Sequence, residues 1–332
     1  EYYHHLREHG ERKYHGNEHD GYYENKGAIM NRLPWELSVD HFVGEEACRF
    51  LRKYGHERPF AMMVGFPGPH CPYDPNEEWL EGLDPEAMPA AVPEVDGDTP
   101  ILRQNGIEGN KKAWNGVDYT EFTEEQKRKI RLHYAASVKQ IDYEIGQILE
   151  TLRDQGLMEN TVIIFASDHG DHLGDHNLIG KSDFYEGSVH VPMLVQGPDI
   201  DRGRTCTELV ELGDVTATLL KLGGCELPDY LDSIPLPALD LGERRQRPYS
   251  IGVTTGGWMI FDGRWKLSKY STGEITFFDL DNDPTEQVNL MRDPSYDEKF
   301  HELDTLLTLA IMRAVTEGDY DQRVDLSGLA TV

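Results

Sequence analysis

The sequence lacks several features that would place it in a class directly. No apolar run approaches the roughly 20 residues that a membrane-spanning helix requires, and the start, EYYHHLREHG, has no apolar signal-peptide core. A GxSxG nucleophile elbow is missing, which argues against a serine hydrolase. The cysteines form no CxxC pair and predict neither a zinc site nor a disulfide framework; they are Cys48, Cys71, Cys206 and Cys225.

These absences predict a soluble protein and leave its compartment open, with the cytoplasm favoured over the periplasm. The chain does not start with Met, which is consistent with a sequence that begins partway through a larger protein. With 332 residues it is long enough for one large core and a smaller appended unit.

Basic residues are few relative to acidic ones. The chain has 60 Asp and Glu against 32 Lys and Arg, for a formal net charge of -28. Such a charge disfavours nucleic acid and anionic membranes as partners and predicts a solvated acidic surface. If the substrate is an anion, positive charge has to be concentrated locally to bind it.

Hydrophobic periodicity and turn residues predict an ordered series of elements. A helix is expected over 38–55, with Ser38 as its N-cap, and a longer one over 123–156, where TEEQ fits a capping box. Between them, FAMMVGF (60–66) is typical of a buried strand. The Pro-, Gly- and Asp-rich stretch 85–117 has no clear period and is expected to form a long surface loop. One interpretation is that this loop lines a pocket.

Two further strands and a change of pattern complete this prediction. TVIIFAS (161–167) and VPMLVQG (191–197) indicate buried strands, so we expect an α/β fold with a mostly parallel sheet sandwiched by helices. From residue 247 the sequence alternates and carries Asp-Gly and Thr-Gly turn signals, which predicts a small antiparallel sheet. A helix over 300–315 is expected to pack on it. The predicted domains are therefore 1–246 and 247–332.

A dense run of polar residues, SDHGDHLGDHNLIGK, directly follows the strand at 161–167. In open α/β sheets, ligands bind beyond the carboxyl ends of the strands. A carboxylate beside an imidazole, as in Asp168 and His169, suits an oxygen-preferring divalent cation that tolerates one nitrogen ligand. Two ligands are too few for a full shell, and a helix N-cap at Asp168 is the alternative reading.

Three segments resemble the sulfatase family of the alkaline phosphatase superfamily. NTVIIFASDHGDHLGDHNLIGKSDFYEGSVHVPMLV is similar to its C-terminal signature, FAMMVGFPGPHCPYDP to its strand and loop with a substrate-binding histidine, and FFDLDNDPTEQVNL to a stretch of its C-terminal subdomain. Their order and spacing match from about residue 38 to 315. The Asp-His pair resembles the branch with choline sulfatases, iduronate-type sulfatases and phosphonate monoester hydrolases.

This resemblance implies a role for four residues. Asp168 and His169 would be metal ligands, and the resemblance implies one divalent cation, with Ca²⁺ favoured over Mn²⁺ or Mg²⁺. Lys181 matches the lysine that contacts the sulfate or phosphoryl oxygens. His70 matches the histidine proposed to contact the anion or to protonate the leaving group. A metal, Lys181 and His70 would together provide the positive pocket that an acidic protein needs.

The family's nucleophile motif, Cys/Ser-x-Pro/Ala-x-Arg, which is oxidised to formylglycine, does not occur in these 332 residues. The paired N-terminal aspartates that complete the family's metal shell are not found either. We therefore expect the chain to represent roughly the C-terminal two-thirds of a sulfatase-like protein, with formylglycine only in the missing N-terminal portion.

The expected function is metal-dependent hydrolysis of a small-molecule or saccharide sulfate ester. Two alternatives are a phosphonate or phosphate ester hydrolase of the same superfamily, and a non-catalytic metal-binding fragment or pseudoenzyme. Homo-oligomerisation is left open.

The N-terminal histidines offer a second metal-binding hypothesis, because His5 and His9 would share a helix face. No neighbouring strand supports it, and a solvated segment or pocket rim is the favoured interpretation. His190 stands where the family commonly has Arg, and no function is assigned to it. The larger histidine set comprises His4, His5, His9, His15 and His19.

Overall fold

The computed structural model describes residues 1–94, 100–112, 116–228, 230–239, 241 and 247–317. They form two compact units. The first contains Glu1–Glu94, Pro100–Gly180 and Val191–Arg204, and the second contains Lys181–His190 and the described residues from Thr205 onward. The domain division predicted at residues 246 and 247 stays a prediction.

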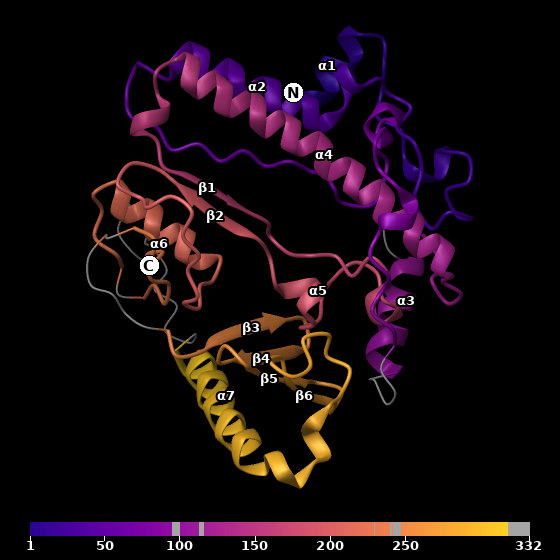
Figure 1. Ribbon diagram of the computed structural model, residues 1–332, viewed down its shortest axis with the longest axis vertical. Coiled ribbons are helices and arrows are strands. Elements are labelled where there is room, and N and C mark those ends of the chain that lie inside the picture. The colour runs from indigo at the N-terminus through magenta and orange to yellow at the C-terminus, as the bar shows by residue number, and fades with distance from the viewer. Residues whose placement is uncertain (95–99, 113–115, 229, 240, 242–246, 318–332) are drawn as a thin grey trace, which may run out of the picture. The chain divides into compact units, whose positions relative to one another are not determined.

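Helices dominate the first unit. They are α1 (Tyr2–Glu8), α2 (Val39–Tyr54), α3 (Pro100–Lys112) and α4 (Glu124–Asp154). Helices α2 and α4 lie side by side (Figure 1). They approach closely at Gly44, where a Cβ atom would lie 2.0 Å from Oε2 of Glu144. His41 of α2 also contacts Oε1 of Glu144, at 2.8 Å.

The two long helices begin where the sequence predicts. Oγ of Ser38 accepts a hydrogen bond from the backbone N–H of His41 at 3.3 Å. At the start of α4, the side chain of Thr123 accepts from the backbone of Gln126 at 3.3 Å, and the side chain of Gln126 accepts from the backbone of Thr123 at 3.0 Å. These bonds satisfy N–H groups that have no partner within a helix. The predicted N-cap and capping box are confirmed.

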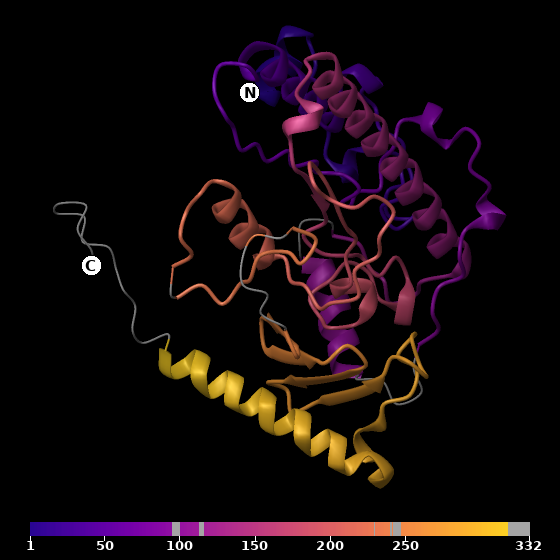
Figure 2. The same cartoon turned by 60° about the vertical axis from the view of Figure 1, so that its left-hand side comes forward.

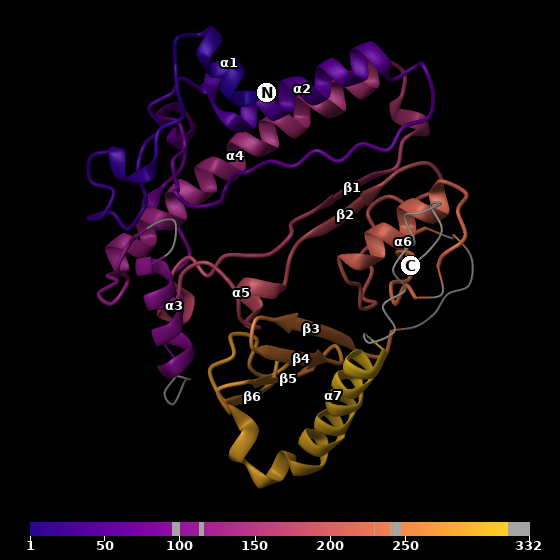
Figure 3. The ribbon, with the colours of Figure 1, turned by 180° about the vertical axis from the view of Figure 1, so that it is seen from behind.

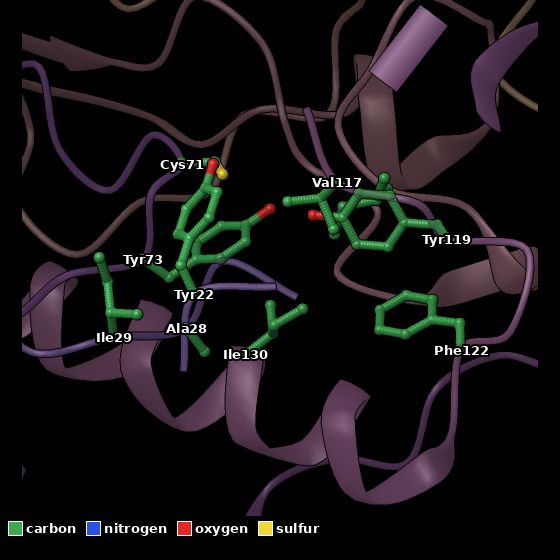
Figure 4. Close-up of a cluster of buried hydrophobic side chains, with 10 residues drawn as sticks. Tyr22, Ala28, Ile29, Cys71, Tyr73, Val117, Tyr119, Phe122 and Ile130 are labelled. Carbon is green, nitrogen blue, oxygen red and sulfur yellow. The ribbon is translucent and has the colours of Figure 1, made fainter. Parts of the chain in front are cut away.

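One core of the first unit joins loops to α4 (Figure 4). We call it the Tyr73 cluster. Tyr73 is 1% exposed, and Ile130 from α4 is fully buried. The cluster therefore fixes the loop that follows His70 against the helix. Its buried members are Tyr22, Ala28, Ile29, Cys71, Tyr73, Val117, Tyr119, Phe122, Ile130 and Ile179.

The predicted strand 60–66 is extended but belongs to no ladder among the described strands. Its side chains alternate: Phe60, Met62, Val64 and Phe66 pack on the core between α2 and α4, while Met63 is 95% exposed. The strand prediction is wrong in this respect. The alternating pattern sets which residues face the helices, whereas a strand also needs a hydrogen-bonded neighbour.

The other two predicted strands form a ladder. Strand β1 (Ile163–Ala166) pairs with β2 (Met193–Gln196), with Phe165 opposite Leu194. The two strands run beside each other (Figure 3). This pair is antiparallel, so the parallel pairing expected for the large sheet is not seen among the described strands.

The expectation of an irregular excursion over 85–117 is wrong in its centre, where α3 lies. Residues 95–99 and 113–115 lie outside the described part of the chain. Gly106 and Gly109 lower the helix propensity of this stretch. Ile107 packs against the Tyr73 cluster, and this tertiary contact outweighs the weak local preference.

The second unit contains the predicted antiparallel meander. Strands β3 (Ser250–Thr254), β4 (Gly257–Phe261), β5 (Trp265–Tyr270) and β6 (Ile275–Asp279) pair in sequence order. Helix α7 (Asp297–Glu317) packs on this sheet (Figure 2) through the fully buried Leu303 and Leu307. The unit also contains α5 (Glu186–Val189) and α6 (Gly213–Leu222).

The turns of this meander fall at the predicted Asp-Gly and Thr-Gly pairs. Gly263 has φ +102° and Gly273 has φ +90°, values that favour glycine. Among the residues that the structure describes, no helix combines the length and the apolar character needed to cross a membrane.

Candidate active site

The Asp168–His169 pair lies just beyond the carboxyl end of β1. Oγ of Ser167 donates a hydrogen bond to the carbonyl oxygen of His169 at 2.8 Å. Oδ1 of Asp168 accepts from the backbone N–H of His169 at 3.0 Å. These short-range bonds hold the turn after the strand, and Oδ2 of Asp168 remains for other contacts.

The ring of His169 is oriented by one hydrogen bond. Its Nδ1 lies 2.8 Å from the carbonyl oxygen of Gly170. A carbonyl can only accept, so Nδ1 carries the proton and a neutral ring presents the lone pair of Nε2. Nε2 lies 3.4 Å from Oδ2 of Asp168. Metal-binding histidines commonly donate their other ring N–H to a carbonyl in this way.

Negative charge gathers around this turn. Tyr134 of α4 has its pKa raised to about 12, first by burial and then by the charges of Asp171 and Asp168. Burial is the larger cause, and the charges of Asp171 and Asp168 add a negative field that also disfavours ionisation of the phenol. A bound cation would be stabilised in the same field.

The donor set fits part of a divalent cation's shell. Asp168 is 84% exposed and His169 is 34% exposed at the side chain, so both are open to a ligand. Within the described ranges, no group of three or more His, Cys, Asp or Glu residues is placed to hold a metal. This also applies to the N-terminal histidines, although the rings of His5 and His9 lie 4.6 Å apart. Ca²⁺ takes six to eight ligands, so further donors would be required.

Asp171 organises the loop that follows the pair, a role that the sequence interpretation missed. Its Oδ1 accepts from the backbone N–H groups of Leu173 at 3.1 Å and Gly180 at 2.9 Å. Its Oδ2 accepts from the hydroxyl of Tyr73 at 2.8 Å. The sequence gives no signal for the role of this second Asp of the run, because its partner Tyr73 is 98 residues away.

His70 lies in the loop that Tyr73 anchors. The residue is exposed, and its Nδ1 lies 2.8 Å from the carbonyl oxygen of Cys71. By the same argument, Nδ1 of a neutral His70 ring carries the proton that this carbonyl accepts. Because Tyr73 bonds to Asp171, the structure ties the His70 loop to the loop after Asp168 and His169 within the first unit.

Lys181 directly follows Gly180 but is grouped with the second unit. Its side chain is partly buried. Gly180 has φ +76°, a left-handed conformation that glycine adopts readily. Three of the four predicted site residues are thus described in the first unit and one in the second.

Two family models and several curated relatives match this chain. The family model described as Sulfatase matches residues 3–225, and that described as N-sulphoglucosamine sulphohydrolase, C-terminal, matches residues 174–312. The choline-sulfatase of Rhizobium meliloti (strain 1021) is 30% identical over 295 residues, covering 83% of this chain and 56% of the relative. An arylsulfatase of Clostridium perfringens (strain 13 / Type A) is 30% identical over 290 residues, covering 82% and 59%.

A solved structure is also similar. The phosphonate monoester hydrolase of Agrobacterium radiobacter aligns with a TM-score of 0.76 at 23% identity, over 92% of this chain and 66% of that chain. The likeness confirms the predicted α/β fold with a small C-terminal antiparallel sheet. The chain spans little more than half the length of the two curated relatives.

Proposed function

Because this chain belongs to the sulfatase family, we propose that it is the metal- and anion-binding part of a sulfate ester hydrolase. The observation that carries this proposal is the Asp168–His169 pair at the end of β1. Oδ2 of Asp168 and Nε2 of His169 lie 3.4 Å apart, and the carbonyl of Gly170 accepts from Nδ1, which leaves Nε2 of a neutral ring able to bind a metal.

In this proposal, Asp168 and His169 supply two ligands to one divalent cation, with Ca²⁺ favoured because most of its ligands are oxygen atoms. Sulfatases generally use a divalent metal. When bound, such a cation polarises a sulfate oxygen and stabilises negative charge in the transition state. The chain's own part is to orient the ligands through Gly170 and Ser167.

We assign His70 to the leaving alcohol of the substrate and Lys181 to its sulfate group. His70 is exposed in its loop, and in its protonated, imidazolium form it donates a proton to the departing alcohol. Lys181 contacts the sulfate oxygens and offsets part of the acidic field around them. Neither residue is the nucleophile, which is expected from a part of the protein outside residues 1–332.

We propose a small-molecule or saccharide sulfate ester as the substrate. The two relatives that are 30% identical are named choline-sulfatase and arylsulfatase, which supports a sulfate over a phosphonate ester. A sulfate monoester carries one negative charge and a phosphate monoester nearly two, so the charge of the complete pocket should discriminate between them.

The test uses the full-length protein that contains residues 1–332 and the nucleophile. An aryl sulfate and an aryl phosphonate are assayed side by side with the wild type, Asp168→Asn and Asp142→Asn. The last variant is the control, because Asp142 is an exposed residue of α4. We expect faster sulfate turnover that Asp168→Asn abolishes and Asp142→Asn preserves. Faster phosphonate turnover would support the alternative activity, and no turnover of either ester would support a non-catalytic protein.

A further inference from the structure

The segment that carries Lys181 is held by the C-terminal sheet. Phe184 and Tyr185 are 4% and 3% exposed. The Phe184 ring lies 5.7 Å from that of Tyr270 on β5, and the Tyr185 ring lies 6.0 Å from that of Phe278 on β6. Two consecutive aromatic residues therefore anchor this segment to two strands.

Two glycines of the sheet make room for Phe184. A Cβ atom on Gly252 would lie 3.2 Å from the Phe184 ring, and one on Gly257 would lie 2.9 Å from it. Nearer the lysine, Oγ1 of Thr254 donates a hydrogen bond to the carbonyl oxygen of Ser182 at 3.4 Å. These contacts with the sheet include Ser182, the residue after Lys181, so the sheet restricts the backbone position from which the Lys181 side chain extends.

A buried ion network fixes the other end of the segment. Nζ of Lys266, on β5, lies 2.7 Å from Oε1 of Glu186 and 2.6 Å from Oε1 of Glu286. The Lys266 and Glu286 side chains are 2% and 1% exposed. Oε2 of Glu286 also accepts a hydrogen bond from the backbone N–H of Glu186 at 2.7 Å. The network thus binds both the backbone and the side chain of the first residue of α5.

The charges of this network depend on one another. Burial would raise the pKa of Glu186, but Lys266 and then His190 lower it overall. Burial raises the pKa of Glu286 despite the attraction of Lys266. Removing Lys266 alone would leave a buried carboxyl without its cation, which is costly.

We infer that Lys266 and Glu286 are positioning residues for Lys181: through Glu186 they hold the segment that presents this lysine to the substrate anion. The inference rests on the proposed function, in which Lys181 contacts the sulfate group. Four residues lie between Lys181 and Glu186, and aromatic contacts fix the chain between them. Loosening the network would let the ammonium group shift, and a displacement of about 1 Å can cost roughly 100-fold in rate.

The experiment uses the full-length protein and the double variant Lys266→Met/Glu286→Gln, which removes both charges of the buried pair. Glu186→Gln is a milder variant, because its side chain is 28% exposed and an amide can still accept from Lys266. Lys269→Met is the matched control, since Lys269 lies on the same strand and pairs with Asp304 of α7. Each is combined with Lys181→Ala.

The readouts are kcat/KM for an aryl sulfate, the inhibition constant of inorganic sulfate, and Tm. We expect the double variant to lower kcat/KM about 10- to 100-fold and to weaken sulfate inhibition, and Glu186→Gln to do the same to a smaller extent. In the Lys181→Ala background, the same changes should cost less than about 2-fold, because the group that they position is gone. Lys269→Met should change neither constant by more than about 2-fold in either background.

Equal losses with and without Lys181 would overturn the inference, and so would losses no larger than those of Lys269→Met. If the double variant does not fold, the Glu186→Gln cycle decides by the same criteria. A separate result bears on the proposed function: if Lys181→Ala alone keeps wild-type turnover, the role of Lys181 itself is wrong. A large effect of Lys181→Ala with additive network effects would reject only the positioning role.

Discussion

Tyr73 donates a hydrogen bond of 2.8 Å to Oδ2 of Asp171, and this bond joins the loop of His70 to the loop of Asp168 and His169. The phenol is 1% exposed within the Tyr73 cluster, where burial and then the charge of Asp171 raise its pKa well above the ordinary value. It therefore stays protonated and acts as a donor. A neutral donor to a carboxylate fixes the distance between the loops without adding charge.

We predict that Tyr73→Phe impairs the site more than it impairs folding. The variant leaves Asp171 without one donor, which should cost about 1 to 3 kcal/mol, and it should lower kcat/KM about 10-fold as the two loops loosen. Tyr119→Phe is the control, since Tyr119 is equally buried and donates to the carbonyl oxygen of Lys26 at 3.0 Å. Equal kcat/KM values for the two variants would show that Tyr73 contributes to stability alone and does not position the site.

Metal removal should abolish activity. Elemental analysis of the full-length protein is expected to find one divalent cation, with Ca²⁺ favoured, and chelation should lower turnover by at least about 100-fold. His169→Ala should weaken metal affinity by a similar factor, because Nε2 is lost. Activity that is indifferent to chelators, together with no bound metal, would contradict the assignment of Asp168 and His169.

Lys181→Ala should affect the transition state far more than the fold. Loss of one charge-assisted contact in a water-excluded pocket typically costs about 2 to 4 kcal/mol, or roughly two to three decades in kcat. Tm should change little, since Lys181 is only partly buried. Lys221→Ala, on α6, is the control and should retain wild-type turnover. Near-normal turnover by Lys181→Ala would exclude this lysine from the site.

Stability should respond to pH through Asp74 and Asp40. Burial and then the charge of Asp40 raise the pKa of Asp74 to about 8, and burial is the main cause that raises the pKa of Asp40 to about 6. Well below about pH 3.9, the ordinary pKa of Asp in an unfolded chain, both carboxyls are protonated in the folded and unfolded states. As pH rises toward 8, the unfolded chain releases protons that the folded protein keeps, so this stability is lost.

Asp74→Asn should therefore raise Tm relative to wild type at pH 8 and leave it nearly unchanged at pH 4. The gain should be about 1 to 3 kcal/mol in the free energy of unfolding, allowing for partial solvent access. Asp142→Asn, at an exposed position of α4, should show no such dependence. A Tm difference for Asp74→Asn that is the same at both pH values would refute the raised pKa.

Elements with local sequence signals could be predicted from the sequence. Prediction failed for elements whose formation depends on contacts between residues far apart in the chain. The caps at Ser38 and Thr123 involve residues three apart, so the pattern contains them. Helix α3 depends on packing of Ile107 against the Tyr73 cluster, which no periodicity reveals. The Asp168–His169 pair is contiguous, so the sequence alone suffices to propose it as a candidate site. Its supports could not be predicted, because Tyr73 and Asp171 are 98 residues apart, and Lys266 and Glu186 are 80 apart.

Residues 1–332 expressed alone are expected to associate through exposed apolar surface. Met63 is 95% exposed in the unpaired extended segment 60–66, and Leu194 and Phe165 are 62% and 39% exposed as cross-strand neighbours on β1 and β2. An extended segment without a strand partner and with exposed apolar side chains can pair with a strand of another molecule. Dye binding and light scattering should detect the association, and Met63→Lys should reduce it more than Met30→Lys, at a less exposed methionine.

The same segment should not turn over an aryl sulfate, because its 332 residues contain no Cys/Ser-x-Pro/Ala-x-Arg motif. Hydrolysis needs a nucleophile held in line with the leaving group, whereas the roles proposed for Asp168, Lys181 and His70 are binding and proton transfer. Joining the segment to the part that carries the nucleophile should restore activity, whereas adding Ca²⁺ alone should not. Multiple turnovers by monodisperse residues 1–332 would show that the nucleophile lies within this chain and that its assignment elsewhere is wrong.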